Sequence, residues 1–300
     1  MSSRVLITGV TGFAGRYLAA NLTEAGHEVL GLTGHPPGQA ASVEGEAPIV
    51  DLRDLRGTRA AILELAPDRV IHLAAISFVG HENIAEIYDT NIVGTRNLLT
   101  ALAELPKRPE AVLLTSSANV YGNADIGVLD EQQPPAPAND YAVSKIAMEY
   151  MARQFSDILP IAISRPFNYT GRGQAESFLV PKIVKHFRQR VDYIELGNID
   201  VSRDFSDVRT VVQYMRRLIE TPAAAGGVYN ICSGRPYSLQ YILDACARIS
   251  GHHLEVRINP AFVRANEVKM LTGDPSRLHR TVGVQPDFSL EDTLAWMLAD

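Results

Sequence analysis

Tyr141 and Lys145 lie four residues apart in the stretch Tyr141-Ala142-Val143-Ser144-Lys145, and these two residue types could together move a proton. In a helix this spacing puts both side chains on one face. An ammonium beside a phenol favours the phenolate and lowers the tyrosine pKa from its usual value of about 10. Such a tyrosine could exchange protons with a substrate oxygen near neutral pH. Because the spacing also arises by chance, the surrounding elements have to support this interpretation.

A glycine-rich loop follows the first apolar run of the chain, and its glycines are spaced three and three. Glycines let a backbone turn tightly and approach a pyrophosphate at a helix N-terminus. An ordinary glycine-rich turn is the alternative, but the strand–loop–helix context favours a dinucleotide-binding loop. The expected cofactor contacts in this loop are Gly9, Gly12, Phe13, Ala14 and Gly15.

Short apolar runs alternate with helical patterns through the first half of the chain. This order predicts an α/β fold of the Rossmann type, with a doubly wound and mainly parallel sheet. The Gly- and Pro-rich stretches 34–48, 122–139 and 222–227 are typical of loops. The expected strands are 5–8, 28–33, 47–51, 68–74, 111–116 and 161–164, and the expected helices follow the glycine loop and lie near 58–65, 91–104 and 141–156.

Size and composition limit the classes of protein to which this chain can belong. The 300 residues suffice for one large α/β domain or two smaller lobes. With 28 Lys and Arg against 34 Asp and Glu, the net charge of −6 argues against a nucleic-acid or anionic-membrane surface. Cys232 and Cys246 show no metal-ligand spacing, and no apolar run approaches the ~20 residues of a membrane span. Since the first strand begins almost at once, we expect no signal peptide. Two thiols without metal-ligand spacing indicate a reducing compartment, so we expect a cytoplasmic location and no metal.

The end of the second expected strand bears on the choice between NADPH and NADH. An NAD-selective site usually places a carboxylate there to bind the ribose 2′-hydroxyl. This strand ends Leu30-Gly31-Leu32-Thr33, and Glu28 lies at its start, where solvent exposure is expected. With no carboxylate to repel a 2′-phosphate, we expect NADPH, with NADH tolerated.

Several further motifs accompany the glycine loop and the Tyr–Lys pair: Asp51-Leu52, His72-Leu73-Ala74-Ala75, Thr90-Asn91-Ile92-Val93-Gly94-Thr95, Ser116-Ser117-Ala118-Asn119-Val120-Tyr121-Gly122 and Pro166-Phe167-Asn168. Together they resemble the extended short-chain dehydrogenase/reductase family over essentially the whole chain. The resemblance implies a smaller mixed α/β substrate-binding lobe at the C-terminal side. The expected division is 1–165 with 204–234 for the dinucleotide-binding domain, and 166–203 with 235–300 for the nucleotide-sugar-binding lobe.

The same resemblance implies roles for individual residues. Ser117 would complete the catalytic set with Tyr141 and Lys145, and Lys145 would also bind the nicotinamide ribose. Asp51 and Leu52 would meet the adenine. The other expected cofactor contacts are Leu73, Ala74, Ala75, Asn91, Tyr141 and Pro166.

The residues after Ser117 discriminate between reactions. The sugar-nucleotide 4,6-dehydratases that this family includes carry acidic residues just before the Val/Leu-Tyr-Gly, because elimination of water needs a base and an acid. Here Ala118 and Asn119 occupy that place, and neither side chain is a useful acid or base. Dehydration is therefore disfavoured. Carbonyl reduction, or epimerisation by transient oxidation, needs only Tyr, Lys and a hydroxyl donor.

Two stretches in the second half, 196–205 and 264–276, look like those of GDP-mannose-modifying members. Arginines suit a nucleoside diphosphate through bidentate, charge-assisted hydrogen bonds. The resemblance implies that Arg203 and Arg264 bind the diphosphate and Glu267 the guanosine ribose. The alternative is that these arginines are solvated or pair with neighbouring acids, and Lys182 competes with Lys185 for a substrate role. The expected substrate contacts are Ser77, Asn119, Asn168, Lys182, Asn198, Arg203, Arg264 and Glu267.

The resemblance implies, as the expected activity, NAD(P)H-dependent reduction of the C4 keto group of a GDP-linked 4-keto-6-deoxy sugar, with GDP-D-rhamnose as the expected product. The stereochemistry at C4 stays open. A nucleotide-sugar 4-epimerase with tightly bound NAD is the main alternative, followed by a GDP-mannose 4,6-dehydratase and a catalytically silent dinucleotide-sensing or interaction protein. The resemblance also implies a homodimer formed by the helices near 91–104 and 141–156.

Overall fold

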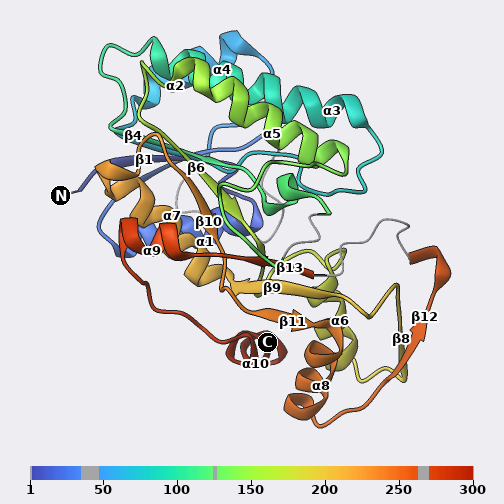
Figure 1. Cartoon of the computed structure of the whole chain (residues 1–300). Helices are drawn as coiled ribbons and strands as arrows, with labels where there is room; N and C mark the ends of the chain where they lie inside the picture. The colour runs from blue at the N-terminus through green and yellow to red at the C-terminus, as the bar shows by residue number, and fades with distance from the viewer. Residues whose placement is uncertain (1, 35–46, 124–126, 263–269, 300) are drawn as a thin grey trace.

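Six parallel strands form the central sheet of the computed structural model, which describes residues 2–34, 47–123, 127–262 and 270–299. Their order is β10-β6-β4-β3-β1-β2, so the chain starts at an inner strand, adds β2 on one side and then builds outward on the other (Figure 1). This is the doubly wound arrangement that the sequence predicts. The strands are β1 (Arg4–Thr8), β2 (Glu28–Leu32), β3 (Arg69–His72), β4 (Ala111–Thr115), β6 (Ile161–Pro166) and β10 (Val228–Ile231).

Alternate residues of these buried strands serve two separate cores. In β1, Val5 and Ile7 pack into one core while Leu6 packs into the other, because successive side chains point to opposite faces of a sheet. In Figure 1 one set of helices covers the upper face and the other the lower face. The first set is α2 (Leu55–Leu65), α4 (Thr95–Ala103) and α5 (Asp140–Ala152), and the second is α1 (Phe13–Glu24), α7 (Val208–Glu220) and α9 (Ser276–Val282).

A smaller mixed part lies beside the carboxyl ends of the central strands, at the lower right of Figure 1. One sheet has the order β11-β9-β13-β5 with β7 on β9, and β11 runs antiparallel to β9 while the other pairs are parallel. Its elements are β5 (Val128–Leu129), β7 (Asn168–Thr170), β9 (Ser202–Asp207), β11 (Pro236–Ser238), β13 (Met270–Gly273), the parallel pair β8 (Tyr193–Leu196) and β12 (Glu255–Ile258), and helices α6 (Leu179–Arg188), α8 (Leu239–Ser250) and α10 (Leu290–Leu298).

The packing of α9 departs from the expected division of the chain. Leu278 and Val282 of this helix lie in the core under the central sheet, although 235–300 was assigned to the substrate lobe. Conversely, β9 pairs within the smaller mixed sheet although 204–207 was assigned to the dinucleotide-binding domain. We infer a two-lobe division in which the chain crosses between the lobes more often than the predicted boundaries imply.

One predicted strand is wrong. Residues 47–51 form no strand; a single parallel bridge joins Thr33 to Ile49. Pro48 lies within this run and has no N–H to donate, so the ladder is limited to Thr33 N–H to Pro48 O and Val50 N–H to Thr33 O. The described part of the predicted loop 122–139 contains the short strand β5.

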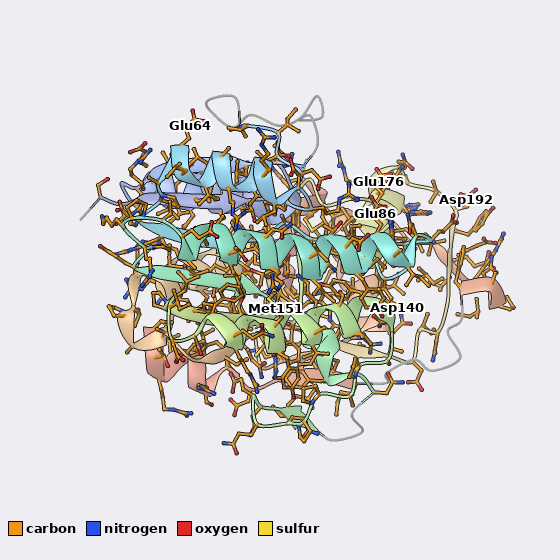
Figure 2. All side chains as sticks on the ribbon, turned by 90° about the horizontal axis from the view of Figure 1, so that it is seen from above. Glu64, Glu86, Asp140, Met151, Glu176 and Asp192 are labelled. Carbon is orange, nitrogen blue, oxygen red and sulfur yellow. The ribbon has the colours of Figure 1, made fainter. Side chains whose placement is uncertain are left out.

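The long helix expected at 91–104 begins earlier than predicted. Its first segment is α3 (Ile84–Tyr88), where Asn83 accepts a hydrogen bond from Glu86 N, and a π-helical turn (Asp89–Gly94) leads into α4. The helix α5 lies beside it, with Glu86 and Asp140 at the same end (Figure 2). The Tyr88 hydroxyl donates to Asp140 Oδ1 at 2.7 Å, so the two helices are joined at that end.

Short 3₁₀ turns complete the secondary structure at Ala118–Tyr121, Arg153–Phe155, Pro222–Ala224 and Pro260–Phe262. Both cysteines are buried free thiols. Within the described ranges, no helix combines the length and the apolar character needed to cross a membrane. No group of three or more potential metal ligands occurs in that same part of the chain. The cytoplasmic location stays a prediction.

Candidate active site

A cleft of about 1240 Å³ opens at the carboxyl ends of the central strands, where the two lobes meet. Open α/β sheets bind ligands at this edge. The loops after β1, β3, β4 and β6 line it from the central sheet, and residues 177–182 and 196–203 line it from the smaller lobe. The glycine loop and the Tyr–Lys pair therefore face one shared space.

The glycine loop forms a cradle whose walls are backbone atoms. A Cβ at Gly15 would lie 2.3 Å from Gly9 O, and one at Gly9 would lie 2.9 Å from Ala74 N. Gly9 also has a φ of +73°, a conformation that favours glycine. Helix α1 then begins at Phe13 with no side-chain cap and no acidic residue in its first turn, so its N–H groups are available to an anion. These features fit the pyrophosphate of a dinucleotide.

Ser117, Tyr141 and Lys145 are brought together from two elements. Ser117 follows the end of β4 in extended conformation, and its Oγ accepts a hydrogen bond from Asn119 N at 3.2 Å. Helix α5 begins where Asn139 accepts from Ala142 N, which fixes the turn that carries Tyr141. All three side chains line the cleft and are largely buried.

The charges around this set differ from the expectation that Lys145 lowers the Tyr141 pKa. Burial raises the pKa of Tyr141, and a hydrogen bond with Ser117 lowers it only in part. The Lys145 Nζ lies 5.9 Å from the Tyr141 ring centroid and donates to Thr115 O at 2.8 Å. Burial lowers the pKa of Lys145 to about 8. Desolvation therefore dominates both groups.

Acid–base groups are scarce next to Ser117. Ala118 is buried, and Asn119 Nδ2 donates to Ser117 Oγ at 3.2 Å. Among the described residues that line the cleft, the carboxylates are Asp51 and Glu86. Both pair with Arg53, at the end of the cleft where the adenine is expected. Among the described lining residues, no carboxylate thus stands beside Tyr141 to act as the base of an elimination.

Arg53 is a cleft residue that the sequence analysis did not single out. Its Nε donates to Asp51 Oδ1 at 2.9 Å and its Nη2 to Asp51 Oδ2 at 2.8 Å. Across the cleft wall, Thr33 Oγ1 at the end of β2 lies 2.9 Å from Thr11 Oγ1. The described residues of that strand end include no carboxylate. Arg53 stands two residues after Asp51 in the sequence, a spacing that could have drawn notice.

Asn91 has a different place from the one expected, because it does not line the cleft. Its buried amide accepts from Ile76 N at 2.9 Å and donates to Ile76 O and to Ser144 Oγ. Asn91 therefore holds the loop after β3 against α5 instead of contacting a cofactor directly. The other expected cofactor residues line the cleft: Gly9, Gly12, Phe13, Ala14, Gly15, Asp51, Leu52, Leu73, Ala74, Ala75, Tyr141, Lys145 and Pro166.

Most of the expected substrate residues also line the cleft: Ser77, Asn119, Asn168, Lys182, Asn198 and Arg203. Lys182 lines it and donates to Glu195 O at 2.7 Å, whereas Lys185 does not line it and pairs with Glu176. Arg203 Nη1 donates to Ser202 O at 2.9 Å. Arg264 and Glu267 lie outside the described residues.

Two buried polar groups next to the cleft were given no role by the sequence analysis. One is His72, whose Nδ1 lies 2.6 Å from Thr8 Oγ1 and whose Nε2 lies 2.8 Å from Thr95 Oγ1. Burial lowers its pKa to about 3, so the ring is neutral. The other is the ion pair of Glu149 and Arg165. His72 stands in one of the motifs named above, but the sequence does not reveal the partners of either group, since these lie 16 to 64 residues away along the chain.

The parallel sheet, the glycine cradle and the Ser–Tyr–Lys set at one cleft define a short-chain dehydrogenase/reductase of the extended type. A family model described as GDP-mannose 4,6 dehydratase matches residues 6–297, and the chain belongs to that family. It is 35% identical over 281 residues to a GDP-6-deoxy-D-talose 4-dehydrogenase of Aggregatibacter actinomycetemcomitans, covering 93% of this chain and 91% of the relative. It is 32% identical to a GDP-6-deoxy-D-mannose reductase of Pseudomonas aeruginosa, covering 100% and 97%.

Solved structures agree on the fold. A candidate epimerase from Burkholderia cenocepacia J2315 is 51% identical with a TM-score of 0.94, covering 99% of this chain and 97% of that one. The RMD protein of Pseudomonas aeruginosa, complexed with NADPH, is 32% identical with a TM-score of 0.85, covering 99% and 98%. The predicted Rossmann-type α/β fold with a smaller mixed lobe is confirmed.

Proposed function

We propose that this chain is an NAD(P)H-dependent oxidoreductase that reduces the C4 keto group of a GDP-linked 4-keto-6-deoxyhexose, converting GDP-4-keto-6-deoxy-D-mannose to GDP-D-rhamnose. The observation that carries the proposal is the placement of Ser117, Tyr141 and Lys145 in the cleft of the glycine cradle, with Ala118 and Asn119 beside them. The names of the two curated relatives, both 4-oxidoreductases or reductases of GDP-6-deoxy sugars, support the substrate class.

The residues of the chain have separate tasks in this reduction. A bound nicotinamide supplies the hydride that the C4 carbon receives. The Tyr141 phenol delivers a proton to the C4 oxygen, and the Ser117 hydroxyl donates a hydrogen bond to that oxygen as charge develops on it. The Lys145 ammonium compensates the negative charge that Tyr141 acquires. Burial excludes water from all three groups, which strengthens these interactions.

Incubation with the GDP-4-keto-6-deoxy sugar and NADPH tests the activity. We expect stoichiometric loss of NADPH absorbance together with formation of a GDP-6-deoxyhexose. The product should be separated by chromatography and its C4 configuration assigned by NMR, which distinguishes GDP-D-rhamnose from GDP-6-deoxy-D-talose. A heat-inactivated sample is the control. Absence of NADPH consumption at saturating substrate would contradict the proposed reduction.

A nucleotide-sugar 4-epimerase is the second candidate, because the solved structure at 51% identity is described as an epimerase. An epimerase would share Ser117, Tyr141 and Lys145 but would retain bound NAD and need no added reductant. Formation of a C4 isomer without net NADPH consumption would favour it. A dehydratase is less well supported because Ala118 and Asn119 provide no acid–base pair.

We predict that NADPH is preferred over NADH. Thr33 follows β2 at the position where an NAD-selective site usually has a carboxylate, which would repel the 2′-phosphate of NADPH. Arg53 lines the same end of the cleft. The measurement is kcat/KM for each cofactor at fixed, saturating sugar substrate. An NADH preference of about a hundredfold would contradict this interpretation.

We also propose a homodimer built on the helices α3–α4 and α5. These helices lie side by side and expose Ile84, Val93, Val143 and Tyr150. Exposed apolar side chains on neighbouring helices are typical of an interface. Sedimentation velocity would show the predicted dimer.

A further inference from the structure

A buried ion pair lies directly behind the catalytic set, and the reduction as described makes no use of it. Glu149 on α5 is 1% exposed and Arg165 on β6 is 5% exposed. Arg165 Nε donates to Glu149 Oε1 at 2.9 Å and Arg165 Nη2 to Glu149 Oε2 at 2.7 Å. Such bidentate geometry fixes the relative position of the two elements.

Further hydrogen bonds tie this pair to residues on both sides of Ser117. The Ser116 hydroxyl donates to Glu149 Oε1 at 2.5 Å, and Arg165 Nη1 donates to the Tyr121 hydroxyl at 3.0 Å. Tyr121 in turn donates to Asn230 Oδ1 at 2.7 Å. Burial raises the pKa of Tyr121 to about 12, so this donor keeps its proton. The pair thus holds both ends of the turn 117–120 from behind.

The charge of Glu149 also affects the pKa of Lys145. Glu149 lies four residues after Lys145 on α5, and its negative charge raises the pKa of Lys145 against the larger effect of burial. The other elements around Lys145 offer little charge. Neutral His72 faces it from β3, the Thr115 carbonyl from β4 and the Tyr141 phenol from α5 itself. Arg165 approaches through Glu149 from β6.

We propose that Glu149 and Arg165 are positioning residues for the reaction centre: they hold β4, β6 and α5 together, and their mutual neutralisation lets Lys145 keep its proton. This inference rests on the proposed function, because the reduction needs the Lys145 ammonium. Neither residue lines the cleft. A lysine that must be charged contributes activity below its pKa and loses it as the pH rises through that value.

The two charges of the pair have opposite effects on Lys145, and this predicts a compensation. Glu149→Gln removes the negative charge and leaves the Arg165 guanidinium unbalanced, so the Lys145 ammonium should lose its proton at lower pH. Adding Arg165→Met removes the excess positive charge and should return the Lys145 titration towards that of the unmodified protein. A purely structural role predicts no such recovery, because the double variant removes more hydrogen bonds.

The direct test follows the Lys145 titration by NMR in protein labelled with ¹³C at lysine Cε, assigned by loss of the signal in Lys145→Arg. We expect titration near pH 8 in the unmodified protein, a fall of about one pH unit in Glu149→Gln, and recovery of most of that fall in Glu149→Gln/Arg165→Met. Glu104→Gln, which breaks the exposed pair with Arg59, is the matched control and should leave the Lys145 titration unchanged.

The activity readout is the pH profile of kcat. In Glu149→Gln the loss of kcat at alkaline pH should begin at a lower pH, in step with the Lys145 titration. Relative to the unmodified protein, kcat of the variant should therefore be reduced more at about pH 9 than at about pH 6. An unchanged Lys145 titration in Glu149→Gln, or no recovery in the double variant, would overturn the inference. If the variants fail to fold, a Lys145 titration of the unmodified protein below about pH 6 would overturn it equally, because Lys145 would then be neutral at pH 7 despite the pair. The NMR test needs no sugar, so its failure is separable from failure of the proposed reduction.

Discussion

Tyr141→Phe should lower kcat by about a thousandfold, because it removes the phenol that lies in the cleft with Ser117 and Lys145 and is assigned to protonate the C4 oxygen. The ring keeps its packing, since phenylalanine has the same shape without the hydroxyl. Binding of NADPH should therefore change little. Steady-state assays with the GDP-4-keto-6-deoxy sugar measure the first quantity, and fluorescence titration with NADPH measures the second.

The matched control for this variant is Tyr150→Phe, on the same helix but with an exposed side chain. It should retain full turnover. Because the effect of Tyr141→Phe is on the chemical step, the loss should appear in kcat and in kcat/KM alike. Turnover close to that of the unmodified enzyme would refute the assignment of Tyr141 as the proton donor.

Gly15→Ala should damage the cofactor cradle more than any other single methyl group in the glycine loop. The new Cβ would lie 2.3 Å from Gly9 O, 2.6 Å from Val10 O and 2.8 Å from Val10 C, all of them backbone atoms. The loop has to move to relieve these contacts, at a cost of about 1–3 kcal/mol. We expect NADPH affinity to fall by at least about tenfold, and the unfolding midpoint to fall as well.

Gly127→Ala is the control for this substitution, because its added Cβ would meet nothing within 4 Å. It should bind NADPH as the unmodified protein does. Fluorescence titration and thermal unfolding, run on both variants, make the comparison. Equal NADPH affinity for Gly15→Ala and the unmodified protein would show that the loop does not approach the cofactor as the cradle geometry implies.

The predicted strands were right where both faces are buried, because a run such as Val5–Leu6–Ile7 must pack on two sides and has few alternatives. The run 47–51 looked similar in composition but forms a single bridge, since Pro48 cannot donate to a ladder. The early start of the helix at Ile84 depends on the Asn83 cap, which the apolar pattern does not reveal. Local composition thus predicted the elements but not all their limits.

The candidate site was predictable as residue types and spacings. The glycine spacing, the Tyr141–Lys145 interval and the Ala118-Asn119 pair are local features, and the structure brings their residues to one cleft. Asn91 was also found by its motif, but its role was not. Its partners Ile76 and Ser144 are 15 and 53 residues away along the chain. Only the tertiary structure therefore shows that the Asn91 amide is hydrogen-bonded to other residues of the protein.

The sequence alone determined which groups could take part: a cradle for a dinucleotide, a phenol, an amine and a hydroxyl, and no acid at 118–119. Tertiary structure decided their charge, because desolvation and buried partners depend on residues distant in sequence. Burial raises the pKa of Tyr141 where the lysine spacing alone predicts a lower one. Glu149 meets Arg165 and Ser116, which lie 16 and 33 residues away, only once α5 packs on the central sheet. The sequence therefore identifies the proton-transfer pair, and the fold determines the burial and the neighbouring charges that set its pKa values.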